Sequence, residues 1–425
     1  MKSPRKIISS FIAIVLLQFL VGGLNAEDTV GLDKKRRESL ARLAALPYLQ
    51  VKSPSPDNVG VTCYDEESAY PGVNLGVSLC PLRAFIIDMK GTILHKWEIE
   101  APQAWPGLKE RWDDYNWRNV HLFKNGDLLA VCPEMGLMKV DKNSKLLWSY
   151  TGEYIAHHDL DIDKNGMIYL LTHREVDSYP GLEITGPILA DYITVLSSRG
   201  EEKEQISIID CFHNSDYAPM LDNMKMEGDI LHTNTLEIID GDLADQSPSF
   251  QAGFILIAVR ELDIIAIIDP EKRKVIWALT GFWRAHHHPT VLPDGNILLF
   301  DNCGSGGRKS KVIEFNPLTQ EIAWAYRGDS ENKFYSQYSG SCHRLPNGNT
   351  LIVESDSGRA FEVTAENKIV WQFNNPYRGT PGEGGGSLYE LIRINPDQYT
   401  FLAESSRSST PRPAPTTIND RGIYE

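Results

Sequence analysis

Residues 266–277 read AIIDPEKRKVIW, which is an apolar strand, a short polar turn and a second strand that ends in tryptophan. The same unit recurs as VIEFNPLTQEIAW at residues 312–324 and as FEVTAENKIVW at residues 361–371. The final tryptophans of these three units are 47 residues apart. That interval is typical of a four-stranded propeller blade, which takes roughly 40 to 50 residues.

Hairpins of a second kind alternate with the tryptophan hairpins. They turn on Asn-Gly or Asp-Gly pairs, which supply the positive φ angles that two-residue turns need. Three more tryptophan-type copies, the last of them degenerate, occupy residues 85–97, 138–148 and 192–210. The turn-glycine copies, two of them looser, occupy residues 121–131, 158–171, 233–259, 288–300, 343–353 and 388–403. Six hairpins of each kind predict six blades.

The order of the hairpins predicts how the ring closes. The first hairpin, at residues 84–98, is of the tryptophan kind, and the last, at residues 388–403, is of the turn-glycine kind. One blade must therefore combine strands from both ends of the chain. We expect an all-β, six-bladed β-propeller over residues 51–405, and six matched pairs fit an eight-stranded barrel or two sandwiches less well.

The two ends of the chain carry other signals. Lys2, Arg5 and Lys6 precede an apolar run and then small residues near Ala26, so residues 1–26 are expected to be a signal peptide. The bulk of Leu24 near the cleavage site leaves an uncleaved anchor as an alternative. The segment DKKRRESLARLAAL predicts a short helix within residues 27–50, and the Pro- and Ser-rich residues 406–425 predict an extended or disordered tail. We expect an exported, periplasmic or secreted protein.

Composition limits the partners. The net charge of -15 argues against nucleic acid and against an anionic membrane, because both favour clustered Lys and Arg. No later segment approaches the roughly 20 apolar residues of a spanning helix. The six cysteines show no zinc-ribbon spacing, and in an exported chain Cys63 and Cys80 are the preferred disulfide pair.

Propeller geometry predicts where the histidines gather. The first strand of each blade lines the central channel, so residues just before it lie near one mouth, as do residues just after the second strand. His158 and His287 share a register, each eight residues before a turn glycine. His232 and Asn234 are two apart at the start of another first strand, so they point to the same side. Arg260 ends the second strand of that blade, as Asn302 does in the next and His173 in the preceding one.

Seven of the eleven histidines fall at these mouth positions: His157, His158, His232, His286, His287, His288 and His343. A structural role is expected for His157, His286, His288 and His343, and Asp301 and Asn302 could simply cap a turn. An arginine at a channel mouth in an acidic protein indicates a bound planar anion, which favours a functional role for Arg260. A metal held by His158, His232 and His287 stays open, although Arg260 is a poor neighbour for a cation.

At these positions the sequence resembles the bacterial arylsulfotransferase family, whose members use aryl sulfates directly as sulfuryl donors and need no nucleotide donor. The resemblance extends from about residue 57 to about residue 403. The matching stretches are YDEESAYPGVNL, FIIDMKGTILHKW, HHDLDIDKNG, DILHTN, IAVRELDIIAIID, HHPTVLPDGNILLFDN and FYSQYSGSCHRLPNGNTLIVES.

The resemblance implies a six-bladed propeller in which one channel histidine is transiently sulfated. Matched by motif, the nucleophile is His287, with His232, His158, Asn234 and Arg260 around the sulfuryl group. A further hydroxyl ligand of the family looks to be replaced here by Ser339 or Ser341, which leaves the substrate range open. The implied partners are a small-molecule aryl sulfate donor and a phenolic acceptor, with no cofactor and no metal.

The chemistry fits these roles. A neutral imidazole is a competent nucleophile and leaving group, so transfer would proceed in two steps with ping-pong kinetics. Arg260 and Asn234 would hold the sulfuryl oxygens, and His158 or His232 would act as general acid and base. Two other classes stay open: a non-catalytic exported scaffold, and a metal- or quinone-dependent oxidoreductase.

Overall fold

The structure is a computed structural model that describes residues 58–78, 84–106, 116–304, 306, 308–376 and 387–402. The expected signal peptide, N-terminal helix and C-terminal tail lie outside the described residues. Among the described residues, no helix combines the length and the apolar character that crossing a membrane requires.

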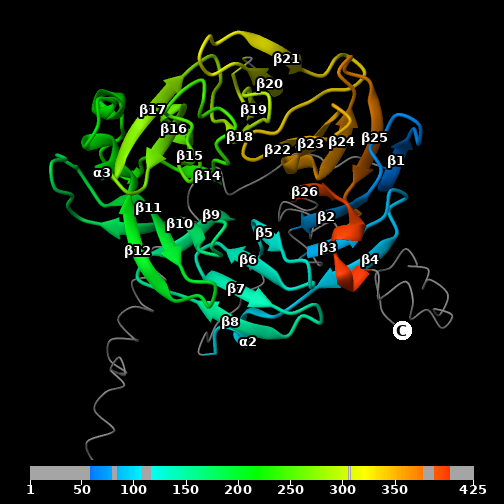
Figure 1. Ribbon diagram of the computed structural model, residues 1–425, viewed down its shortest axis with the longest axis horizontal. Helices are drawn as coiled ribbons and strands as arrows, with labels where there is room; N and C mark the ends of the chain where they lie inside the picture. Colours follow the sequence, from blue (N-terminus) through cyan, green and yellow to red (C-terminus); the bar gives the residue numbers. More distant parts are fainter. Residues whose placement is uncertain are drawn as a thin grey trace, which may run out of the picture. The chain divides into compact units, whose positions relative to one another are not determined.

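Six antiparallel sheets form a ring, each counted here as one blade (Figure 1). The first strand of each blade lies nearest the centre of the ring. The predicted six-bladed all-β propeller is therefore confirmed. Blades 2 and 3 comprise β5 (Val120–Leu122), β6 (Leu128–Cys132), β7 (Gly136–Val140) and β8 (Leu146–Tyr150), then β9 (Ile155–Ile162), β10 (Ile168–Val176), β11 (Ile188–Leu196) and β12 (Glu202–Ser207), with β13 (Gly228–Asp229) paired to β11. Blades 4 and 5 comprise β14 (Thr233–Ile238), β15 (Ile255–Val259), β16 (Ile264–Asp269) and β17 (Lys274–Thr280), then β18 (His287–Val291), β19 (Ile297–Asp301), β20 (Lys311–Phe315) and β21 (Ile322–Tyr326).

Blades 1 and 6 involve both ends of the described chain. Blade 1 has the order β26 (Leu388–Ile394), β2 (Val73–Ser78), β3 (Ala84–Ile87) and β4 (Ile93–Trp97), so its inner strand is the last strand in sequence. Blade 6 comprises β22 (Ser341–Arg344), β23 (Thr350–Glu354), β24 (Arg359–Val363) and β25 (Ile369–Asn374), and β1 (Gly60–Tyr64) adds a fifth strand at its outer edge.

Two predicted hairpins differ from the structure. Residues 388–403 were expected to form two strands, but the chain turns into a 3-10 helix at Pro396–Gln398 after β26, and β2 is the second strand of blade 1. The hairpin at residues 192–210 ends early, because the Ser207 hydroxyl accepts a hydrogen bond from the Asp210 amide and caps the helix α3 (Ile208–His213). The other short helices are α2 (Ala101–Ala104) and 3-10 turns at Ala218–Leu221, Arg260–Leu262 and Ser355–Ser357.

Apolar packing between blades forms the core. The buried residues of the described chain form clusters, and each cluster draws its members from two successive blades. Leu171 of blade 3 and Ile257 of blade 4, for example, lie in one cluster. Each blade therefore buries both faces only when its neighbours are in place, and the free energy of burial supports the ring as a whole.

The repeated tryptophans connect one blade to the next. The indole nitrogen of Trp97 in blade 1 donates to the Gly126 carbonyl in the first hairpin of blade 2, at 3.1 Å. In the same way Trp371 of blade 6 donates to the Met89 carbonyl of blade 1, at 2.9 Å. Gly126 has a φ of 90°, which the tight turn needs and which glycine adopts readily. The sequence repeat is therefore also a repeat of contacts between blades.

Cys63 lies on β1 and has a free thiol, whose sulfur is 4.0 Å from the Ile369 carbonyl oxygen. The disulfide expected between Cys63 and Cys80 is therefore not formed at Cys63, and Cys80 lies outside the described residues. The register brings Cys63 opposite Gln372 of β25, because β1 pairs with the edge of blade 6. Strand pairing holds this segment in place of a covalent link.

A buried ion pair joins blades 1 and 6. Arg393 of β26 donates to Glu362 of β24 at 3.0 Å, and neither side chain is exposed. Arg393 also donates to Asn74 at 2.7 Å, and Glu362 accepts from the Tyr70 amide at 2.7 Å. The pair thus connects the last strand, the N-terminal segment and blade 6 at one point.

We predict that Glu362→Gln lowers the free energy of unfolding by roughly 3–5 kcal/mol, because it leaves the Arg393 guanidinium buried without its counter-charge. Urea denaturation followed by tryptophan fluorescence measures the change. The control is Lys368→Gln, which breaks the exposed Lys368–Asp65 ion pair and should leave the free energy of unfolding nearly unchanged, because solvent screens that pair. Equal losses in the two variants would contradict the importance of the buried pair.

Candidate active site at the channel mouth

The inner strands bring polar side chains from five blades and from the segment before β5 to one small cavity of about 40 Å³. A cavity of this size accommodates a group of only a few atoms. Its lining consists of Arg118, Asn119, His158, Asp159, Asn234, Thr235, His287, His288, Ser339, Gly340, Ser341, Tyr389 and Glu390. A larger cavity of about 560 Å³ lies elsewhere, along β5 and the Gln398–Tyr399 segment, and none of the candidate residues lines it.

Irregular strand starts aim the histidines. The pairing of β9 with β10, of β14 with β15 and of β18 with β19 shifts register near the start of each inner strand. His158, His232 and His288 each have a φ near 50°, in the left-handed region that is costly for residues with a side chain. Strained backbone of this kind is concentrated at functional sites, where the surrounding structure holds it.

The hydrogen bonds of His287 fix which nitrogen carries its proton. Nδ1 is 2.8 Å from the Asn302 side-chain oxygen and 3.1 Å from the Ala285 carbonyl oxygen. The Asn302 amide nitrogen donates to the Ser336 and Ser339 carbonyls, so its oxygen must face His287. Both partners of Nδ1 are acceptors, and Nδ1 therefore bears the hydrogen. Nε2 of His287 is then an unprotonated nitrogen, and it is buried without a hydrogen-bond partner.

Electrostatics keep this imidazole neutral. Burial, followed by the charge of Arg260, holds the pKa of His287 well below the ordinary value of 6.5, and the hydrogen bond that His287 donates to Asn302 opposes this only in part. Arg118 adds to the lowering. His287 is therefore an uncharged base with its lone pair available near neutral pH.

His232 and His158 lie beside His287 and differ from it in their partners. His232 forms a hydrogen bond through Nδ1 with the Asp229 carboxylate. Its ring contacts that of His158 edge-on, with the ring centres 4.7 Å apart. Burial, followed by His232 and then Arg118, holds the pKa of His158 well below 6.5. His232, which is paired with a carboxylate, thus lies beside His158. Of the two, His232 is the better proton donor and acceptor, because Asp229 stabilises its charged form.

Two guanidinium groups lie near the cavity. Arg260 follows β15 directly, and its guanidinium forms an ion pair with Glu261, which also pairs with Lys225. Arg118 lies just before β5 and stacks over the Tyr389 ring at 4.5 Å. Both charges lower the pKa of His287, which indicates that both lie near it.

Asn234, Ser339 and Ser341 line the cavity, but each already has protein partners. The Asn234 amide donates to the His286 carbonyl at 2.9 Å and its oxygen accepts from the Thr235 hydroxyl at 3.1 Å. The Ser341 hydroxyl donates to Glu390 at 2.6 Å, and Ser339 offers its carbonyl to Asn302. The second hydrogen of the Asn234 amide and the Ser339 hydroxyl are the donors that these three residues have left for a ligand.

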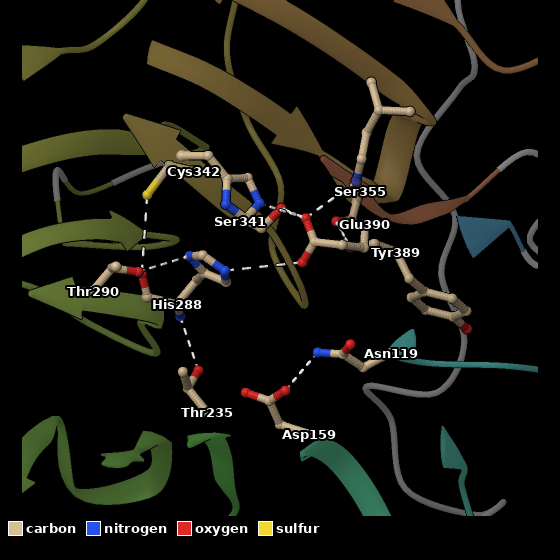
Figure 2. Close-up of polar contacts among 12 residues, drawn as sticks. Asn119, Asp159, Thr235, His288, Thr290, Ser341, Cys342, Ser355, Tyr389 and Glu390 are labelled. Carbon is tan, nitrogen blue, oxygen red and sulfur yellow. Dashed lines mark hydrogen bonds and ion pairs between the residues drawn. The ribbon is translucent and has the colours of Figure 1, made fainter. Parts of the chain in front are cut away.

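A carboxylate cluster forms the other side of the cavity (Figure 2). Glu390 of β26 accepts from His343 at 2.8 Å and lies 3.9 Å from Nε2 of His288. Burial raises the pKa of Glu390, but His343, His288 and Ser341 outweigh it and lower the pKa to about 2. Asp159 accepts from Asn119, and burial raises its pKa to about 8 despite backbone hydrogen bonds.

The structure thus brings five of the seven predicted site residues to one cavity: His158, His287, Asn234, Ser339 and Ser341. The other two lie outside the lining. His232 contacts the ring of His158, and the charge of Arg260 acts on His287. Sequence reasoning missed Arg118, Asn119, Tyr389 and Glu390 as lining residues. Arg118 and Asn119 immediately precede an inner strand, so the rule that located the histidines would have found them too.

Comparison with known families is consistent with this geometry. The family model of the arylsulfotransferases (ASST) matches residues 119–376, which is more than half of the chain. The chain belongs to the arylsulfotransferase family. The resemblance noted in the sequence is thereby confirmed.

Solved structures of low identity are similar to the chain over most of its length. A crystal structure of a protein of unknown function from Bacteroides caccae has 13% identity and a TM-score of 0.50, with 76% of this chain and 99% of that chain covered. A streptogramin B lyase structure has 13% identity and a TM-score of 0.42, covering 76% of this chain and 85% of the other. The first likeness shows the propeller fold alone. Curated proteins gave no match.

We predict that His287 stays neutral, with its proton on Nδ1, even at pH 6.5, where an ordinary histidine is half protonated. Nitrogen NMR of histidine-labelled protein reads both the tautomer and the pKa. Arg260→Gln should raise the pKa of His287, because it removes a nearby cation. Lys225→Gln, which removes the other cation paired with Glu261, is the matched control and should leave that pKa unchanged. Titration near pH 6.5 in the unaltered protein would contradict the assignment.

Proposed function

We propose that this protein transfers a sulfuryl group from an aryl sulfate ester to a phenolic acceptor through a sulfohistidine at His287. The observation that carries the proposal is the state of His287: an unprotonated Nε2, buried without a hydrogen-bond partner and near two guanidinium groups. A nucleophile for sulfur must present a lone pair to an anionic group, and the guanidinium charges favour the approach of that anion.

In the first half-reaction, the Nε2 lone pair of His287 attacks the sulfur, and the bond from sulfur to the aryl oxygen breaks. The departing phenolate takes a proton from His232. Asp229 supports this role, because its carboxylate accepts the Nδ1 hydrogen of His232 and stabilises the charged imidazolium. Arg260, Arg118 and the remaining Asn234 hydrogen would hold the sulfuryl oxygens.

In the second half-reaction, the acceptor hydroxyl gives its proton to His232 while its oxygen attacks the sulfur. The bond from sulfur to Nε2 breaks, and His287 returns to its neutral state. Since donor and acceptor use one site in turn, the kinetics should be ping-pong. The cavity of about 40 Å³ has room for the sulfuryl group but not for an aromatic ring as well, so both rings would lie at the mouth of the channel.

A non-catalytic scaffold accounts less well for these features, because it has no need of a buried imidazole whose free nitrogen lacks any partner. The predicted export through residues 1–26, with the helix and linker at 27–50 and the tail at 406–425, remains part of the proposal.

Replacement of the nucleophile tests the reaction directly. We expect 4-nitrophenyl sulfate with a phenol acceptor to give 4-nitrophenol, and His287→Ala to lower the rate by on the order of 10⁴-fold or more. Donor alone should add one sulfuryl group to His287, which peptide mass spectrometry detects. His213→Ala, at an exposed histidine of α3, is the control and should retain full activity. Undiminished release in His287→Ala would refute the role of His287.

The acid role of His232 has a separate test in the leaving group. Asp229→Asn should lower the rate with an unactivated phenyl sulfate by roughly 10²- to 10⁴-fold, because the departing phenolate then lacks an efficient proton donor. With 4-nitrophenyl sulfate the loss should be much smaller, since that leaving group needs little protonation. Equal losses with both donors would show that Asp229 has only a structural role.

A further inference from the structure

Behind the channel histidines, three buried side chains on neighbouring strands of blade 3 face one another. His157 lies on β9, His173 on β10 and Asp191 on β11, and His173 and Asp191 are direct partners across the sheet. One ligand atom from each lies within 4.8 Å of the others. The three residues are 2% to 6% exposed, so the group is almost completely enclosed.

The two imidazoles have nitrogens that no hydrogen bond satisfies. Nε2 of His157 and Nε2 of His173 are both buried and have no hydrogen-bond partner. Nε2 of His157 is 3.8 Å from the Asp191 carboxylate, and Nε2 of His173 is 3.5 Å from the Glu134 carboxylate. These separations are too long for good hydrogen bonds. Buried polar atoms without partners are rare in native proteins, and each one indicates a missing partner such as an ion or a water.

We propose that His157, His173 and Asp191 bind one divalent transition-metal ion, with Zn²⁺ as the expected occupant. Two imidazole nitrogens and one carboxylate oxygen are a common donor set for zinc, with bonds of about 2.0–2.2 Å. Nε2 of His157 lies 3.8 Å from the Asp191 carboxylate and the three ligand atoms lie within 4.8 Å of one another, so the group must contract around an ion with bonds of this length. The other Asp191 oxygen accepts from the Thr233 amide at 2.7 Å, which fixes the carboxylate toward His157.

An ion at this position would also set the protonation of a residue in the cavity. Nδ1 of His157 is 2.9 Å from Nδ1 of His158. If Nε2 of His157 is a metal ligand, its hydrogen lies on Nδ1 and is donated to His158, whose own hydrogen is then on Nε2. The relevance of this tautomer to catalysis rests on the proposed function, whereas the metal site itself does not.

The described residues contain one further group with metal-like spacing, His288, His343 and Glu390. There Nε2 of His343 already has a hydrogen bond of 2.8 Å to Glu390, so no ion is needed to satisfy it. This group supplies a matched control, because it also offers two imidazoles and one carboxylate, with glutamate in place of aspartate.

The test is zinc binding by the full-length protein after removal of metals with a chelator. Zinc is added either to the folded protein or during refolding from urea, so that slow entry into a buried site does not hide binding. We expect one equivalent by elemental analysis after dialysis. His173→Gln and Asp191→Asn should each weaken binding by on the order of 100-fold or more, and His343→Gln should not.

Melting curves without metal first establish that each variant folds. Zinc should then raise the melting temperature of the unaltered protein and of His343→Gln, but not that of His173→Gln. The proposal is overturned if the unaltered protein retains no zinc, if binding survives both His173→Gln and Asp191→Asn, or if His343→Gln alone abolishes it. None of these measurements uses a sulfate ester, so they remain valid if sulfuryl transfer is not the reaction.

Discussion

The packing of each blade against its neighbours is the constraint on which the rest of the structure depends. No blade has a core of its own, because the buried apolar clusters lie between successive sheets. The indole groups of Trp97 and Trp371 reinforce this arrangement with hydrogen bonds from one blade to the next. The ring must therefore close before any blade is fully stable, and Arg393 and Glu362 join the first and last blades at that closure. Only a closed ring brings the starts of the inner strands to one cavity.

The chemistry of the site follows from burial under nearby positive charge. In water an imidazole is half protonated near pH 6.5, but His287 is enclosed and close to Arg260 and Arg118. Burial first and then the positive charge favour its neutral form, and the same positive charge attracts an anion. Asn302 contributes by fixing the tautomer, and the carbonyls of Ser336 and Ser339 fix Asn302 in turn. The unprotonated nitrogen of His287 is thus defined by a chain of hydrogen bonds through Asn302.

Much of the fold could be predicted from the sequence because the contacts between blades repeat. The tryptophan hairpins recur at a regular interval, and so do the turn glycines, of which Gly126 has the required positive φ. Blade 1 was harder to predict, because β2 has neither signal and replaces the expected strand after Ile394. The added strand β1 was missed for the same reason.

The site was predictable in position but not in detail. The rule that inner strands start at one mouth correctly brought His158, Asn234 and His287 together. The rule was applied to histidines, so Arg118 and Asn119 were missed. Glu390 was missed because it lies in one of the looser hairpins, at residues 388–403. Side-chain orientation depends on the register shifts at the strand starts, which no sequence pattern marks. Hence the pairing of His232 with Asp229, and the enclosed group around His173, could be seen only in three dimensions.

The fifth strand of blade 6 has a consequence for the behaviour of the protein in concentrated solution. The outer strand of a sheet presents unpaired backbone amides and carbonyls, which can recruit another chain and start aggregation. At blade 6 the outer strand is β1, and its pairing with β25 along Gly60–Tyr64 shifts register between Val61 and Cys63. An irregular outer strand of this kind is a poor template for another chain. Proteolytic loss of the segment before Asp65 would make β25 the edge strand, so the irregular β1 limits edge-to-edge association on this side of the ring.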